Sequence, residues 1–258
     1  MKNKLKSYIS ILFCLILLFE NANANEPFVF NVTEIEILED GNKINGYKGG
    51  TATSKDGSTI TAENFFYNKL TNILETSGNV KYFDKIKNIA ITTDKAIYFK
   101  NEEKFFTNGN SKAINDNNTI TASILEYDKI NNIFKAKKNA VANDFEKDAT
   151  IYADEITYFK NEEKILTDGN TKALIENKYK FNSENVSYYR NSGRLISQKK
   201  SSLEDDSGNI YKLESFVYNI NKEMLRGKEV DVFAKVNENK IDQYFFQKDF
   251  LILKTKVI

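Results

Sequence analysis

A tyrosine that recurs at a nearly constant spacing constrains the fold of this chain more than any other feature of its sequence. The tyrosines are Tyr67, Tyr98, Tyr127, Tyr158, Tyr188 and Tyr218, so the sequence number advances by 31, 29, 31, 30 and 30 from one to the next. A fixed period of roughly 30 residues is typical of proteins built from stacked structural units. The clearest copy, residues 60–84, has a turn near Asn68–Asn72 and a second break at Gly78-Asn79. The sequence therefore predicts six similar β-rich units.

Three further columns of residues accompany the tyrosine in every unit. Seven residues before it lies an apolar residue, five before it a mostly small residue, and two before it a second, mostly apolar residue. The columns are Ile60, Ile91, Ile120, Ile151, Phe181 and Tyr211; Ala62, Thr93, Ala122, Ala153, Ser183 and Leu213; and Phe65, Ala96, Leu125, Ile156, Val186 and Phe216. Side chains alternate between the two faces of a strand, so the change of parity between the second and third columns predicts a β-bulge in each unit.

The second half of each unit carries an apolar pair, and two alternate units are nearly identical. The segment 98–104 (YFKNEEK) recurs at 158–164, and the segment 107–113 (TNGNSKA) recurs at 167–173 (TDGNTKA). This echo skips one unit, which indicates that a block of two units is the duplicated element.

Residues 1–24 have the organisation of a secretory signal peptide. Three lysines precede an apolar run at residues 8–19, and Ala22-Asn23-Ala24 forms a small-x-small cleavage site. A retained N-terminal anchor is the alternative, although a helix that spans a bilayer needs about 20 apolar residues. The chain's one cysteine, Cys14, lies inside the apolar run and is not preceded by small residues, so no lipid anchor is predicted.

The chain after the predicted leader contains neither cysteine nor histidine. Disulfides, thiolate chemistry and an imidazole base are therefore excluded from it. The whole chain has a formal net charge of +1, and the leader removes three lysines and one glutamate, which leaves −1. Because charges of both signs are interspersed, the sequence gives no electrostatic indication of nucleic-acid binding.

The two ends of the mature chain differ from the repeat. Residues 27–54 predict an opening hairpin around Asp40-Gly41-Asn42, because Asp-Gly between apolar runs is a strong hairpin signal. Residues 237–258 are strongly apolar and are either a terminal edge strand or the end of a truncated longer chain. We therefore predict three parts: the signal peptide at 1–24, a repeat domain at 25–236, and this terminal segment.

The short polar turns predict antiparallel neighbours, since parallel strands need long crossovers. We expect about 15 strands and almost no helix. A flat meander of this length would be unusual, and a bulge in every unit offers a uniform place to fold it. The prediction is an all-β fold of two facing layers with the apolar columns inside. A right-handed parallel β-helix is the alternative.

The motif of the first repeat unit resembles that of a known protein family. The pattern at Gly57, Ile60, Ala62, Tyr67, Leu74 and Gly78-Asn79-Val80 is similar to the OstA family of lipopolysaccharide-transport domains, which includes LptA, LptC and the N-terminal periplasmic domain of LptD. The later units repeat this motif, so the resemblance covers most of the mature chain. It implies an antiparallel β-jellyroll shaped like a folded taco, whose apolar interior holds the acyl chains of lipid A.

The resemblance also implies partners and a place in the cell. The partners would be lipopolysaccharide, other LptA- or LptC-like jellyrolls that pair edge to edge, and an outer-membrane barrel with its lipoprotein partner. The place would be the periplasm, at or near the periplasmic face of the outer membrane. The eight column residues expected to contact lipid are Ile60, Phe65, Ile91, Leu125, Ile151, Ile156, Val186 and Phe216. The alternative for these residues is that they fill a closed core.

The resemblance leaves two assignments within the family open. A complete LptD continues into a large barrel, preceded by a cysteine-containing segment, and neither follows here. The chain is therefore expected to be an LptD-type N-terminal domain or a free-standing LptA-like carrier, and the motif favours the former.

Two other functions compete with lipid transport. A structural or adhesive surface repeat with a closed core and no lipid cargo is the main alternative. A polysaccharide-cleaving enzyme is the third possibility, but Glu102-Glu103, Glu162-Glu163 and Asp205-Asp206 lie in predicted solvated turns. No catalytic residue, cofactor or metal site is predicted.

Overall fold

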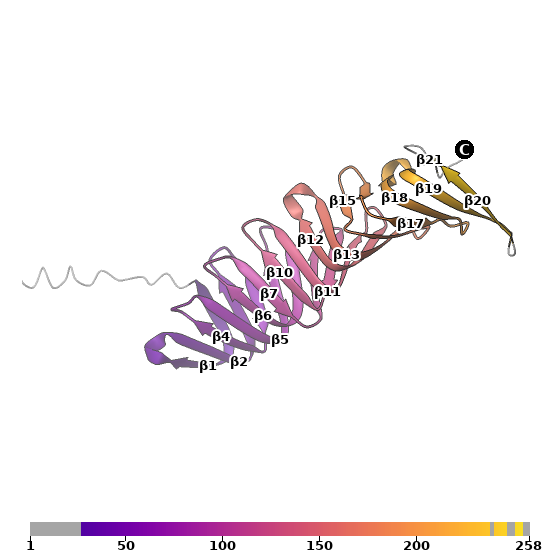
Figure 1. Cartoon of the computed structure of the whole chain (residues 1–258). Coiled ribbons are helices and arrows are strands. Elements are labelled where there is room, and N and C mark those ends of the chain that lie inside the picture. Colours follow the sequence, from indigo (N-terminus) through magenta and orange to yellow (C-terminus); the bar gives the residue numbers. More distant parts are fainter. Residues whose placement is uncertain (1–26, 238–239, 247–250, 255–258) are drawn as a thin grey trace, which may run out of the picture.

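One antiparallel sheet, folded lengthwise into two halves, accounts for nearly all of the computed structural model (Figure 1). The structure describes residues 27–237, 240–246 and 251–254, so the predicted signal peptide lies outside the described residues. Within them the helical segments are three short 3-10 turns at Glu39–Gly41, Lys160–Glu162 and Ile220–Lys222. The all-β prediction is confirmed, and the antiparallel ladder excludes the parallel β-helix.

The described part of the chain forms 21 strands, which follow one another as a meander. They are β1 (Phe28–Leu38), β2 (Lys43–Ser54), β3 (Thr59–Ala62), β4 (Asn64–Asn68), β5 (Ile73–Asp84), β6 (Ile89–Phe99), β7 (Lys104–Asn108), β8 (Ser111–Asn115), β9 (Asn118–Ala122), β10 (Ile124–Asp128), β11 (Ile133–Asp144), β12 (Ala149–Phe159), β13 (Lys164–Ile175), β14 (Tyr179–Glu184), β15 (Ser187–Tyr189), β16 (Arg194–Ser197), β17 (Ser201–Glu204), β18 (Ile210–Asn219), β19 (Met224–Asn237), β20 (Lys240–Phe246) and β21 (Leu251–Lys254).

Several of these strands are two halves of one row of the sheet. β3 and β4 both pair with β2, and β20 and β21 both pair with β19. The same holds for β7 with β8, β9 with β10, β14 with β15, and β16 with β17. Joining these pairs turns the 21 described strands into 15 rows, which is the number that the repeat predicts.

The rows bend at a line of bulges that crosses the sheet, as the parity change predicts. In the first unit the register between β5 and β6 shifts between Ser77 and Val80, where Gly78 and Asn79 both have positive φ. Glu63, between β3 and β4, accepts a hydrogen bond from the Asn79 side chain at 2.6 Å. The Glu63 side chain also lies where a Cβ on Gly78 would be, so this position needs glycine.

The bulges divide the sheet into two halves. Half-sheet A contains the short strands β4, β10 and β15, which carry repeat tyrosines, together with β7, β16 and β21. Half-sheet B contains β3, β8, β9, β14, β17 and β20. The long strands run through both halves; they are β1, β2, β5, β6, β11, β12, β13, β18 and β19. Folding at the bulges places the inner faces of A and B against each other, with a core between them.

The core is continuous and largely aromatic in half-sheet A. All six repeat tyrosines are at most 2% exposed. Tyr127 stacks on Phe134 with ring centroids 4.4 Å apart, and Tyr82 stacks on Phe105 at 4.8 Å. Offset or edge-on aromatic pairs add about 0.5–1.5 kcal/mol each beyond the area they bury. The tyrosine column therefore holds one side of the core together along the length of the molecule.

The segments at the two ends join this sheet. β1 and β2 form the opening hairpin, with residues 39–42 at its turn. At the other end β20 and β21 pair with β19, so the described part of the terminal segment lies at the edge of the sheet. β1 and β20 lie at opposite ends of the elongated molecule (Figure 1).

Candidate functional site: the seam between the half-sheets

The long side of the molecule opposite the bulges is a seam where two series of turns meet. The turns of half-sheet A follow the repeat tyrosines and include residues 99–104, 128–133 and 159–164. The turns of half-sheet B include residues 54–59, 84–89, 115–118 and 144–149. These turns lie at opposite ends of each row, so side-chain contacts between them show that the sheet is folded closed.

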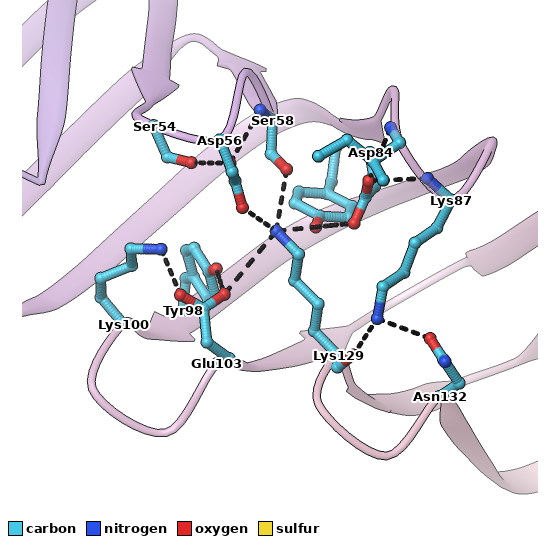
Figure 2. Close-up of polar contacts among 12 residues, drawn as sticks. Ser54, Asp56, Ser58, Asp84, Lys87, Tyr98, Lys100, Glu103, Lys129 and Asn132 are labelled. Atoms are coloured by element: carbon cyan, nitrogen blue, oxygen red, sulfur yellow. Dashed lines mark hydrogen bonds and ion pairs between the residues drawn. The ribbon is translucent and has the colours of Figure 1, made fainter.

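Lys129 makes the central contact across the seam (Figure 2). Its ammonium comes from the turn after β10 in half-sheet A. It forms an ion pair with Asp56, lies 3.0 Å from the Ser58 hydroxyl, and lies 3.5 Å from the Asp84 carboxylate, all in half-sheet B. Glu103, in half-sheet A, lies 3.7 Å away. We call these five residues the Lys129 cluster.

Burial and charge act in opposite directions on the Lys129 cluster. Burial by itself lowers the pKa of Lys129, but its bond to Asp56 and the charges of Asp84 and Glu103 outweigh that effect and raise it. Burial likewise acts to raise the pKa of Asp56, yet the bonds from Lys129, Ser54 and Ser58 hold that pKa below its usual range. The Lys129–Asp56 pair is therefore fully charged at neutral pH.

Arg190 makes a second contact of the same design, farther along the seam. Its Nε donates to Asp144 Oδ2 at 2.8 Å across the seam, and its Nη1 pairs with Glu163 in half-sheet A. The Tyr188 hydroxyl also donates to Asp144, at 3.0 Å. Burial acts to lower the pKa of Arg190, but Asp144 and Glu163 raise it. Asp144, Glu163, Tyr188 and Arg190 form the Arg190 cluster.

The two clusters repeat with the two-unit echo of the sequence. Asp84 and Asp144 occupy equivalent positions in successive two-unit blocks, and so do Glu103 and Glu163. Asp84 and Asp144 also accept backbone N–H bonds in the same way, from the residues two and three positions later. Each copy of the duplicated two-unit block therefore corresponds to one charged cluster.

Sequence reasoning did not identify these residues, although the sequence contains a signal for them. A basic residue stands two positions after the tyrosine in five of the six units. Five positions after the tyrosine the residues are Asn72, Glu103, Asn132, Glu163, Gly193 and Glu223. The acid therefore alternates with a neutral residue. A column analysis that extended past the tyrosine into the turn would have found both features.

The tyrosine hydroxyls reach from the core to the seam. Tyr98 donates to Glu103, and Tyr158 donates to Glu163 at 3.2 Å. Tyr67 donates to Asn72 at 2.7 Å. Burial is the main cause that raises the pKa of Tyr98 and Tyr158, and the neighbouring glutamate raises it further. Tyr127 differs from these three, because its hydroxyl is buried without a hydrogen-bond partner.

The eight column residues predicted to contact lipid lie together on the inner faces of the two half-sheets. None of them is more than 2% exposed. Ile60, Ile91 and Ile151 lie in half-sheet B, whereas Phe65, Leu125, Ile156, Val186 and Phe216 lie in half-sheet A or at its bulge. Outside this core, a cleft of about 390 Å³ opens at the seam beside Asn115, Glu163 and Arg190.

The apolar inner face is uncovered at both ends of the molecule. In an antiparallel pair, directly opposed residues share a face. Ile37 is opposite Ile44, which is opposite the buried Tyr67, and yet Ile37 is 62% exposed. At the other end Phe246 is opposite the buried Val230 and is 42% exposed. Among the described residues, each end therefore combines an unpaired backbone edge with inner-face residues that lack a covering strand.

The described ranges do not meet the requirements of a metal site or of a membrane-spanning helix. No group of three or more acidic, histidine or cysteine side chains there is arranged to hold a metal ion. No helix in the part of the chain that the structure describes is long and apolar enough to cross a membrane.

The fold and seam define an elongated, folded antiparallel sheet closed by repeated ion-pair clusters. No family model and no curated protein matches the chain. Among solved structures it is similar to LptH, the LptA-homologous periplasmic component of the lipopolysaccharide transport device from Pseudomonas aeruginosa. The identity is 11%, the match covers 62% of this chain and 96% of LptH, and the TM-score is 0.26.

A second similar structure is the TCP10 domain of CPAP from Danio rerio, solved with a peptide of STIL. The identity is again 11%, the match covers 83% of this chain and 99% of that domain, and the TM-score is 0.20. Neither likeness is close enough to transfer a function to this chain.

Proposed function

We propose that this chain is a non-catalytic module of periplasmic lipopolysaccharide transport, which pairs edge to edge with similar folded sheets and holds lipid A acyl chains between its two halves. The observation that carries the proposal is the exposed inner face at both ends of a continuous apolar core. The sequence pattern that resembles OstA-type transport domains supports it independently.

The ends fit a partner that continues both the ladder and the core. β1 and β20 each pair on one side only within the described residues, so each offers unpaired N–H and C=O groups. Such edges are sites of strand addition. Ile35 and Ile37 at one end, and Tyr244 and Phe246 at the other, need an apolar cover. A second folded sheet supplies the backbone bonds and the cover at once.

Lipid binding in the core requires the two half-sheets to separate. The column residues pack into one core and are closed off from solvent, so acyl chains enter by displacing side-chain contacts. The Lys129 and Arg190 clusters set the cost of this separation along the seam. Apolar surface contributes about 25 cal/mol per Å² removed from water, so acyl chains can replace the lost contacts between the halves.

Photocrosslinking tests the cargo. A crosslinking amino acid replaces Phe65, Leu125 or Ile156 in living cells, with Lys69 in a turn as the matched control. The proposal expects lipopolysaccharide adducts at the three core positions and none at Lys69. Protein adducts without lipid at all three core positions would contradict it.

A covalent link across the seam tests whether lipid enters the core by separation of the two half-sheets. The mature sequence has no cysteine, so Ile86→Cys and Ile130→Cys supply the only thiols, one on each side of the seam. Both residues are exposed, and Lys87 joins their two turns through Asn132. A bismaleimide link is expected to abolish lipid adducts at Leu125, while the unlinked double variant keeps them. Equal adduct yield in both forms would show that lipid enters elsewhere.

The closed core favours one other function, a structural repeat without lipid cargo. The eight column residues predicted to contact lipid are at most 2% exposed, as in a dry core. This candidate shares the edge-to-edge pairing but predicts no lipid adduct at any position. The photocrosslinking experiment therefore decides between the two.

A further inference from the structure

Between the two charged clusters the seam holds two lysines whose hydrogen bonds go to neutral groups. Lys87, from half-sheet B, donates to the Lys129 carbonyl and to the Asn132 side chain at 2.6 Å. Lys160, from half-sheet A, donates to the Lys87 carbonyl at 3.0 Å and to the Asn115 side chain at 3.2 Å. All four of these acceptors are uncharged oxygens, so within the described residues neither ammonium is paired with a carboxylate.

The repeat explains why charge compensation is missing here. Asn132 stands five residues after its tyrosine, where Glu103 and Glu163 stand in the neighbouring units. Asn115 ends its strand where Asp84 and Asp144 end theirs. This unit therefore keeps the basic residue of the repeat and lacks both acids that pair with it in the clusters.

The surroundings of Lys87 oppose its charge. Burial is the main cause that lowers the pKa of Lys87; the charges of Lys129 and Lys160 lower it further, whereas Asp84 and Glu103 raise it. A partly buried ammonium next to two other cations is stabilised by a bound anion. Ammonium-to-phosphate hydrogen bonds are charge-assisted and stronger than bonds to neutral oxygens.

Two exposed apolar side chains lie on the turns that Lys87 joins through its bond to the Lys129 carbonyl. Ile86, beside Lys87, is 75% exposed, and Ile130, beside Lys129, is 66% exposed. Exposed isoleucines on the turns around two ammoniums that have no carboxylate partner match a ligand that joins an anionic group to hydrocarbon.

We propose that Lys87 and Lys160 form a binding site across the seam for a phosphate group, carried by a lipid whose hydrocarbon contacts Ile86 and Ile130. Two ammoniums from opposite half-sheets would hold the phosphate together with the amides of Asn115 and Asn132. The lipid part of this inference rests on the proposed transport function, whereas the phosphate part does not.

Calorimetric titration of the mature protein with inorganic phosphate tests the phosphate part. Saturable binding is expected, and Lys87→Ala and Lys160→Ala are each expected to weaken it about tenfold, the loss of one charge-assisted bond. The matched control is Lys147→Ala, the equivalent of Lys87 in the next two-unit block, where Glu146 already pairs with the ammonium. This variant should leave binding unchanged.

Restoring the acids of the repeat is the sharper variant. Asn115→Asp with Asn132→Glu gives this unit the residues of its neighbours, so folding should be retained and checked by circular dichroism. Phosphate binding should fall at least about tenfold, because both ammoniums gain internal partners. Absence of saturable phosphate binding, or binding that none of these variants weakens, would overturn the inference while leaving the core crosslinking result untouched.

Vesicle co-sedimentation identifies the source of the phosphate. The expected result is binding to phosphatidylcholine vesicles that contain phosphatidic acid, weaker binding to phosphatidylcholine alone, and loss of the difference in Lys87→Ala. Phosphate binding with no preference for the phosphatidic acid vesicles would keep the phosphate site and overturn its lipid ligand.

Discussion

Removing the charge of Lys129 should destabilise the fold more than removing any neighbouring lysine charge. Lys129→Met keeps the length and apolar stem of the side chain but leaves its carboxylate partners without a cation. Asp84 is 1% exposed, so its carboxylate cannot regain full hydration. Breaking a buried ion pair from one side typically costs about 3–5 kcal/mol.

The structure places the expected value at the lower end of that range. Asp84 keeps the backbone N–H groups of Ile86 and Lys87, each at 3.0 Å, and the Tyr82 hydroxyl at 3.4 Å. Asp56 is part-exposed and keeps its bond from the Ser58 backbone. We therefore expect Lys129→Met to lower the free energy of unfolding by about 3 kcal/mol.

Equilibrium urea unfolding, followed by far-ultraviolet circular dichroism, measures this change. The matched control is Lys100→Met, because Lys100 pairs with Glu103 inside one turn and not across the seam. Its expected cost is about 1 kcal/mol or less. A double-mutant cycle with Asp56→Asn should give a coupling of about 1–3 kcal/mol between Lys129 and Asp56. Equal costs for the two lysine variants, or no coupling, would refute the view that the Lys129 cluster holds the seam closed.

Three other measurements test the same structure. The pKa of Asp56 is lowered from its ordinary 3.8, so the stability that the Asp56 carboxylate supplies is complete above about pH 4 and is lost as the pH falls below that value. The loss of unfolding free energy between pH 5 and pH 2 should therefore be smaller in Lys129→Met than in the parent protein. An unchanged pH profile would contradict the assignment of the Lys129–Asp56 pair. Gly109→Ala should cost about 2–4 kcal/mol of unfolding free energy, because φ is +88° and the new Cβ would meet the Asp94 carboxylate. Gly57→Ala, with φ +81° and open space, should cost only about 1 kcal/mol, and similar losses would argue against the tight bulge. Tyr127→Phe removes a buried hydroxyl that has no partner and should be neutral or stabilising, whereas Tyr158→Phe should cost about 1 kcal/mol with its bond to Glu163; the reverse order in thermal denaturation would disprove the hydrogen-bond assignment.

The repeat allowed the sheet to be predicted because the spacing of its apolar columns indicates which residues share a strand face and where a bulge occurs. An apolar residue every second position fixes a strand face, and a change of parity fixes a bulge. Tyr67 and its equivalents are buried at the positions that the period indicates, and the register shifts where the columns change parity. These features depend on residues close together in sequence, which pattern reasoning reads directly.

The seam depends on contacts that no local pattern contains. Lys129 and Asp56 are 73 residues apart, and Lys160 and the Lys87 carbonyl are also 73 apart. They meet only because the rows fold at the bulges, which brings the two series of turns together. Read as separate turns, Glu102-Glu103 and Glu162-Glu163 are solvated charges of no consequence. In the folded sheet, Glu103 and Glu163 are acids of the two clusters, and Asn132 at the equivalent position between them gives Lys87 an uncharged acceptor. The alternation of Glu and Asn along the turns therefore decides which seam cations are paired with carboxylates, and this consequence can be recognised only after the fold is known.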